Sequence, residues 1–182
     1  MLDRDGLQKA LTRVGERLFE RGQFVELAIY GGSAIMMQFA WRTGTEDVDA
    51  VVRDGYDERV LGSVVREVAA EMGLEDDWMN DAVGMFTPLQ EPEELFAVAG
   101  LYPSPSRPGL RVLLATPSYL LAMKLMAMAN PGRGTKDLDD ARHLAREVGI
   151  TTEQALMSLY VSVHGEEPAL ASRSRFARVL ET

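Results

Sequence analysis

The chain has 182 residues, 46% hydrophobic and 26% charged, which is typical of a globular domain and excludes a disordered one. A net charge of -9 argues against non-specific binding to nucleic acid or anionic membranes. Because there is no cysteine and only two histidines, a disulfide scaffold, a cysteine nucleophile and thiolate or His-rich metal sites are excluded, and any metal must rest on carboxylates. The charged N-terminus and the lack of a long apolar run predict a soluble, cytoplasmic protein with no membrane partner.

The first elements place a glycine pair between a strand and a helix. Helical spacing of leucines and valine predicts a helix from Asp5 to Arg21, and a short apolar run predicts a strand from Phe24 to Tyr30. After Gly31-Gly32-Ser33, a helix is expected from Ala34 to Trp41. Backbone N–H groups at such a helix start can bind an anion, because glycine lets a ligand approach the main chain. A plain tight turn is the alternative.

The next strand carries two acids. Thr45 to Val52 predicts a strand in which alternation sets Asp47 and Asp49 on one face, while the apolar residues between and after them take the other. Neighbouring carboxylates repel each other unless a cation neutralises them. Asp47 and Asp49 are therefore candidate ligands of a divalent metal such as Mg²⁺, with a solvated strand end as the alternative.

The middle of the chain is less regular. Apolar spacing predicts a helix from Asp57 to Met72, followed by a polar stretch from Glu75 to Asp81. The segments Val83 to Phe86 and Leu95 to Leu101 fit either strands or loops. Gly109 to Ala115 then predicts a buried strand.

An apolar helix with a single charge follows. Thr116-Pro117 is a strong helix start, and the helix expected from Ser118 to Ala129 is apolar on nearly every side, which predicts that it is buried. Lys124 is its only charged residue. Burying an ammonium group is costly without a partner, so Lys124 either extends its amine to solvent or meets a phosphate or carboxylate in a cleft.

Acids also occur on the next predicted helix, which runs from Thr135 to Val148 after a loop at Asn130 to Gly134. At 100° per residue, Asp137 falls inside the apolar arc and Asp140 at its edge, whereas Asp139 points to solvent. An acid on the apolar face needs a partner. Pairing with a core arginine or with the helix N-terminus is the alternative to a functional role.

Charge is divided unevenly along the chain. Residues 46–94 contain 15 acidic and 3 basic residues, whereas residues 106–146 contain 7 basic and 3 acidic ones. If these halves meet, acids that hold a metal would face bases that hold phosphate. Two further helices, Thr151 to His164 and Pro168 to Leu180, are predicted to cover the core, and both histidines are assigned to the surface or to ordinary hydrogen bonding.

Two motifs together resemble the nucleotidyltransferase superfamily. Gly31-Gly32-Ser33, a helix and then Thr45-Glu46-Asp47-Val48-Asp49 are similar to its Gly-Gly/Ser turn followed by D-x-D on a strand. Leu120 to Leu125, with Lys124, and Lys136 to Asp140 resemble motifs of bacterial AbiEii-type nucleotidyltransferases, which include toxin–antitoxin toxins. Trp78-Met79-Asn80-Asp81 resembles a W-L-N-D element of small members. The resemblance spans roughly residues 25 to 145.

The expected fold is of the α+β class, a nucleotidyltransferase-like small mixed β-sheet flanked by helices, with a helical C-terminal part. A single domain, 1–182, is expected, with its core at about 23–115 and the helical part at about 116–182. The resemblance implies Mg²⁺-dependent transfer of an NMP from an NTP to an acceptor hydroxyl, with release of pyrophosphate. The acceptor would be an RNA end such as tRNA, a protein or a small molecule.

The resemblance also implies roles for particular residues. Nucleotide binding would involve Gly31, Gly32, Ser33 and Lys124, and Asp47 and Asp49 would bind Mg²⁺. The catalytic residues would be Asp47, Asp49, Lys124, Asp137 and Asp140. Many members carry a third metal-binding acid on a later central strand, yet residues 110–115 contain none, so Asp81 or Asp137 is expected to substitute. The alternative is a catalytically weak nucleotide- or partner-binding module, for example a toxin–antitoxin component held by a small antitoxin-like partner.

Overall fold

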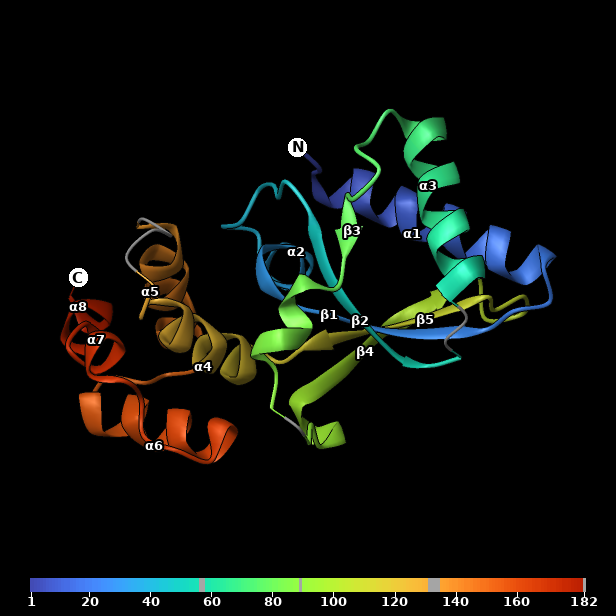
Figure 1. Ribbon diagram of the computed structural model, residues 1–182. Helices are drawn as coiled ribbons and strands as arrows, with labels where there is room; N and C mark the ends of the chain where they lie inside the picture. The colour runs from blue at the N-terminus through green and yellow to red at the C-terminus, as the bar shows by residue number, and fades with distance from the viewer. Residues whose placement is uncertain (56–57, 89, 131–134, 182) are drawn as a thin grey trace. The chain divides into compact units, whose positions relative to one another are not determined.

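The computed structural model describes residues 1–55, 58–88, 90–130 and 135–181, and the chain within them forms an α+β fold (Figure 1). It divides into two compact units. Unit 1 comprises Met1–Met85 and Phe96–Ala115, and unit 2 comprises Phe86–Leu95 and Thr116–Thr182. The expected helix start at Asp57 and most of the expected loop, residues 131–134, lie outside the described residues.

Unit 1 is built on a five-stranded mixed sheet in the order β3-β2-β1-β5-β4. Its strands are β1 (Val25–Ile29), β2 (Val48–Asp54), β3 (Met79–Asn80), β4 (Phe96–Tyr102) and β5 (Leu110–Ala115). β1 is antiparallel to β2 and parallel to β5, β3 is parallel to β2, and β4 is antiparallel to β5. The antiparallel pairing brings the end of β1 to the start of β2.

Three helices accompany the sheet: α1 (Arg4–Glu20), α2 (Gly31–Gln38) and α3 (Glu58–Met72). α1 and α3 lie together on one face of the sheet (Figure 1). The predicted apolar spacing of α1 is confirmed, since Leu7, Leu11, Val14 and Leu18 are fully buried. Gly15 permits close packing, because a Cβ at this position would lie 2.5 Å from the carbonyl carbon of Tyr102 in β4.

Two predicted boundaries near the motifs are wrong. The second helix begins at Gly31 rather than at Ala34, because the glycines themselves form its first turn. The second strand begins at Val48 rather than at Thr45, because the backbone of Thr45 pairs instead with Leu2. The helix and strand types were predicted correctly, but the ends differ as well: α2 ends at Gln38 rather than at Trp41, and β2 ends at Asp54 rather than at Val52.

Of the two segments left open between strand and loop, one is a strand and one a helix. Leu95 to Leu101 corresponds to β4, and Val83 to Phe86 falls in the 3₁₀-helix η1 (Ala82–Phe86). The polar stretch before them contains β3, which was not predicted. Its anchor is Trp78, 2% exposed, whose indole Nε1 donates to the carbonyl oxygen of Val65 in α3 at 3.1 Å.

Unit 2 is helical. Its elements are η2 (Glu93–Leu95), α4 (Pro117–Ala127), α5 (Lys136–Glu147), α6 (Glu153–His164), α7 (Leu170–Arg173) and α8 (Phe176–Leu180). Thr116 caps α4 as predicted, accepting a 3.4 Å hydrogen bond from the backbone N–H of Tyr119. The single helix expected from Pro168 to Leu180 is instead two short helices, α7 and α8. Ser172 in α7 and Arg175, just before α8, donate to the carbonyl oxygens of Leu125 and Met128.

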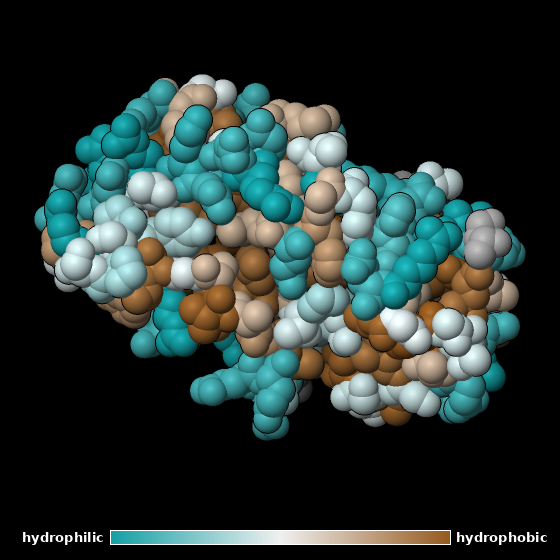
Figure 2. Space-filling model, turned by 180° about the vertical axis from the view of Figure 1, so that it is seen from behind, coloured by the Kyte–Doolittle hydropathy of each residue, from teal (hydrophilic) through white to brown (hydrophobic). Residues whose placement is uncertain are grey.

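The surface is mixed in polarity. Figure 2 shows hydrophilic side chains interrupting the hydrophobic areas of the face in view. Within the described ranges, every helix is too short or too polar to cross a bilayer.

Candidate functional site

The glycine pair sits where β1 meets β2. The backbone N–H of Tyr30, the residue after β1, donates to the carbonyl oxygen of Asp49 in β2 at 2.9 Å. Gly31 follows with φ of +59°, a left-handed conformation that favours glycine, and α2 starts there. The first N–H groups of a helix have no intrahelical acceptor, so the turn Gly31-Gly32-Ser33 presents donors of the kind that bind phosphate.

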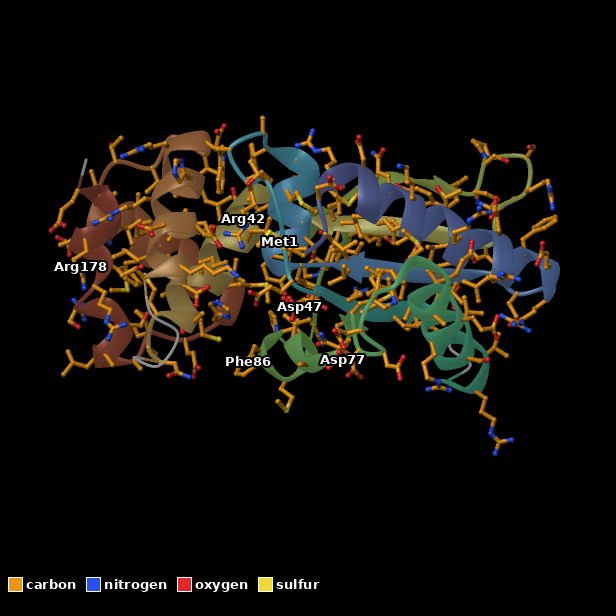
Figure 3. The ribbon with its side chains drawn as sticks, turned by 90° about the horizontal axis from the view of Figure 1, so that it is seen from above. Met1, Arg42, Asp47, Asp77, Phe86 and Arg178 are labelled. Carbon is orange, nitrogen blue, oxygen red and sulfur yellow. The ribbon has the colours of Figure 1, made fainter. Side chains whose placement is uncertain are left out.

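Asp49 lies against this turn. A Cβ added at Gly31 would stand 2.3 Å from Asp49 Oδ2, so the carboxylate occupies the space that any larger residue at 31 would fill. Asp49 is half-buried, whereas Asp47 is exposed just before β2 (Figure 3). Val48 and Ala50 are buried, as the predicted alternation requires. Unit 1 therefore joins the glycine turn and the D-x-D motif in one place.

Two more side chains line Gly32 and were not among the predicted site residues. Arg42 Nη2 would lie 2.9 Å, and Thr45 Oγ1 3.1 Å, from a Cβ at Gly32. Arg42 Nε donates to the carbonyl oxygen of Gly44 at 3.1 Å, which holds the guanidinium beside the turn. Thr45 is 4% exposed and its hydroxyl donates to the carbonyl oxygen of Asp47 at 3.0 Å. In the sequence they are marked only by their position between the two motifs.

Ser33 is placed differently from the glycines. It is 1% exposed, and its hydroxyl donates to the carbonyl oxygen of Tyr30 at 2.9 Å inside the protein. The hydroxyl thus stabilises the first turn of α2. Any contact of Ser33 with a phosphate would therefore come from its backbone N–H.

The donor set of this site suits a hard cation. Asp47 and Asp49 offer carboxylate oxygens, which Mg²⁺ prefers, and Gly31 leaves room for the second of them. Among the described residues, no three acidic or histidine side chains gather closely enough to form a metal-binding group. Asp81, one of the two expected third acids, is exposed just after β3. The residues present fit an ion held by two protein carboxylates, with the remaining oxygens supplied by water, substrate or uncharged side chains.

The other predicted charges meet in unit 2. Lys124 Nζ in α4 lies 2.7 Å from Asp137 Oδ1 and 2.9 Å from Asp140 Oδ2 in α5. Lys124 is 8% exposed, Asp137 4% and Asp140 2%. The predicted burial of Asp137 is confirmed, and Asp140 is equally buried. Lys124 thus has carboxylate partners, and the alternative that it extends to solvent is wrong. We call these three residues the buried triad.

The C-terminal helices hold the helix that carries Lys124. The carbonyl oxygens of Ala122 and Leu125 in α4, and of Met128 just after it, contact side chains of later residues: His164 Nε2 at 3.2 Å, the hydroxyl of Ser172, and Arg175 Nη1 at 2.7 Å. The last carbonyls of a helix have no intrahelical donor, so the bonds to Leu125 and Met128 stabilise the end of α4, whereas Ala122 lies further inside the helix. The three contacts also fix the backbone on either side of Lys124.

His164 should make this packing sensitive to pH. Burial lowers the pKa of His164 from its ordinary value of 6.5, although Glu166 and the Ala122 carbonyl act in the opposite direction. A folded pKa below the unfolded one favours the folded state above about pH 6.5, and this stability is lost progressively as the pH falls. Urea unfolding at about pH 7.5 and about pH 5.5 should show a smaller acid loss for His164→Gln, which keeps a donor for Ala122. Equal losses in both proteins would exclude this role.

Comparison of the chain with models of protein families, with curated proteins and with solved structures gave no match. The motifs and the geometry around them therefore carry the functional argument. Within unit 1, that geometry joins the glycine turn, Arg42 and Asp49 of the D-x-D motif; within unit 2, it joins Lys124 to two acids.

Proposed function

We propose that this protein is a Mg²⁺-dependent nucleotidyltransferase of the nucleotidyltransferase fold type, which transfers an NMP from an NTP to an acceptor hydroxyl and releases pyrophosphate. The observation that carries the proposal is the contact between the two motifs, with Asp49 Oδ2 in the space beside Gly31. A phosphate at the turn and a cation on the acids would then be neighbours. That is the arrangement a triphosphate bound with its metal requires.

The site residues of unit 1 have distinct roles in the proposed reaction. Asp47 and Asp49 would hold Mg²⁺, which supplies stabilisation of the charge that develops on the phosphates. The backbone N–H groups of Gly31 and Gly32 would bind phosphate oxygens, because both residues lack a side chain that would keep the phosphate away. Arg42, held beside Gly32, would add a charged donor for a phosphate oxygen.

The catalytic role of the buried triad stays a prediction. In unit 2 the ammonium of Lys124 is already shared by Asp137 and Asp140. A group with two carboxylate partners binds a further anion less strongly than an unpaired lysine, because the three side chains carry a net negative charge. The family resemblance supports a contact between Lys124 and phosphate. The ion pairs instead support a role for Lys124 in positioning Asp137 and Asp140.

A binding module with little turnover is the second candidate function. The small number of acidic residues at the site favours this function. β5 contains no acidic residue, and among the described residues no third acidic side chain joins Asp47 and Asp49. A site with two carboxylates holds divalent cations less tightly than one with three. Such a module would bind an NTP with Mg²⁺, or a partner such as a small antitoxin-like protein, without releasing pyrophosphate.

Residues 106–146, which contain 7 basic and 3 acidic residues, suggest an RNA end such as tRNA as the acceptor. Much of that charge is already neutralised: Arg111 lies 3.0 Å from Glu26, Arg142 lies 3.4 Å from Asp139, and Lys124 belongs to the buried triad. RNA binding is therefore expected to be weak and to weaken further with salt. Protein and small-molecule hydroxyls are the other acceptors to be tested.

One experiment separates these functions. The protein is incubated with Mg²⁺, each α-labelled NTP, and total RNA, protein or a small-molecule mixture, and label transfer and pyrophosphate are measured. Calorimetric titration measures the binding of Mg²⁺ and of each NTP to the same protein. The transferase would be supported if label is transferred to any acceptor by the wild-type protein and not by the double variant Asp47→Asn, Asp49→Asn. NTP binding without pyrophosphate would support the binding module. If neither Mg²⁺ nor any NTP binds, the proposed function is wrong.

A further inference from the structure

Asn80 is the side chain that the sheet sets next to Asp49. β3 pairs with β2 in parallel, with Val48 opposite Met79 and Asp49 opposite Asn80. The backbone N–H of Val48 donates to the carbonyl oxygen of Trp78 at 2.7 Å, which fixes this register. Paired residues of neighbouring strands, about 4.8 Å apart, project to the same face of a sheet. Asn80 and Asp49 therefore leave the sheet side by side, both half-buried.

The amide of Asn80 is held in place. Its Oδ1 accepts a hydrogen bond from the backbone N–H of Ala82 at 3.1 Å. An amide oxygen has two lone pairs and can accept or ligate once more. The buried indole of Trp78, anchored on α3, keeps β3 at this edge. An uncharged oxygen thus stands next to the half-buried carboxylate, at a site to which the described residues bring no third carboxylate.

We infer that the Asn80 amide oxygen is the third protein ligand of the Mg²⁺ ion held by Asp47 and Asp49. This inference rests on the proposed function. Asn80 would then be an uncharged ligand at a position where other sites could use a third carboxylate. The cation would therefore be held by two negatively charged protein ligands instead of three. Because charge count sets the affinity of carboxylate sites, the site binds the free cation weakly and gains its remaining ligands from the triphosphate.

Asp81 is the competing residue. It follows Asn80 directly, but it lies just outside β3, and the strand pairing with β2 ends at Asn80. Asp81 is exposed, and its carbonyl oxygen accepts from the backbone N–H of Gly84 at 2.9 Å, at the start of the turn of η1. Its carboxylate is therefore assigned to solvent, and Asp81→Asn serves as a control.

The test measures Mn²⁺ binding by electron paramagnetic resonance, with no nucleotide present. Asn80→Asp keeps an acceptor for Ala82 and adds a charge, so it should tighten Mn²⁺ binding about tenfold or more, and Asn80→Ala should weaken it several-fold. Ala82→Asp adds the same charge two residues away at an exposed position, and both it and Asp81→Asn should change binding less than the Asn80 variants do. Urea unfolding of each variant shows whether it remains folded.

The outcomes separate this inference from the function on which it rests. If Asp49→Asn leaves Mn²⁺ binding unchanged, the metal site and the proposed function both fail. If Asp49→Asn abolishes binding while Asn80→Asp behaves as Ala82→Asp does, the two-acid site stands and the role of Asn80 is wrong. A larger loss in Asp81→Asn than in Asn80→Ala would assign the third ligand to Asp81 and also overturn the inference.

Discussion

Replacing Asp49 with asparagine is expected to reduce nucleotide transfer by at least about 10²-fold, because the loss of one preorganised charge contact in a transition state has an effect of this size. The substitution keeps the shape of the side chain beside Gly31, so the first turn of α2 should stay intact. It also relieves repulsion between Asp47 and Asp49, which should leave the free energy of unfolding equal or slightly higher. Initial rates of pyrophosphate release and melting temperatures of both proteins measure the two effects.

The matched control is Asp54→Asn, the same substitution at the far end of β2. Asp54 is exposed, and its Oδ1 accepts from the backbone N–H of Gly55 at 2.8 Å. It should change transfer by less than about twofold, because it lies beyond the motif and its charge is screened by solvent. Calorimetric titration with NTP, with and without Mg²⁺, then shows whether the loss in Asp49→Asn lies in binding. Wild-type transfer by Asp49→Asn would rule out the metal pair.

Replacing Lys124 with methionine is expected to destabilise the protein by about 3–5 kcal/mol, the usual result of removing one partner from a buried ion pair. Sequence alone suggests the opposite, since an isolated buried lysine is better replaced by an apolar side chain of similar length. The structure reverses the sign, because methionine would leave Asp137 and Asp140 buried next to each other without a cation. Urea unfolding followed by circular dichroism measures the change.

The control also removes the charges of Asp137 and Asp140, which Lys124→Met leaves without a cation. A triple variant, Lys124→Met with Asp137→Asn and Asp140→Asn, should recover much of the lost stability, because a neutral buried cluster avoids uncompensated charge. Asp139→Asn, on the exposed face of the same helix, should be close to neutral. A Lys124→Met protein as stable as wild type would show that Lys124 does not stabilise the two acids. Measuring NTP binding by the folded triple variant then tests the phosphate contact apart from stability.

Local sequence determined much of the fold. Helical spacing identified α1 and the buried position of Asp137, since both depend only on the 3.6-residue period and on which residues are apolar. Thr116-Pro117 identified the start of α4, because a cap is a local contact. The glycine pair and the D-x-D motif were also visible in the sequence, as residue types whose chemistry suits phosphate and Mg²⁺.

Only the tertiary structure decided which of these groups are neighbours. The parallel pairing of β2 with β3 sets Asn80 beside Asp49, and the packing of α4 against α5 gives Lys124 its two acids. Local propensity predicts neither contact. β3 has only two residues and lies in a polar stretch, so it does not look like a strand. The residues around Lys124 do not show which acids it will pair with. Register and helix packing are fixed by contacts between residues far apart in the chain, so a local pattern can show that a residue needs a partner but does not identify the partner.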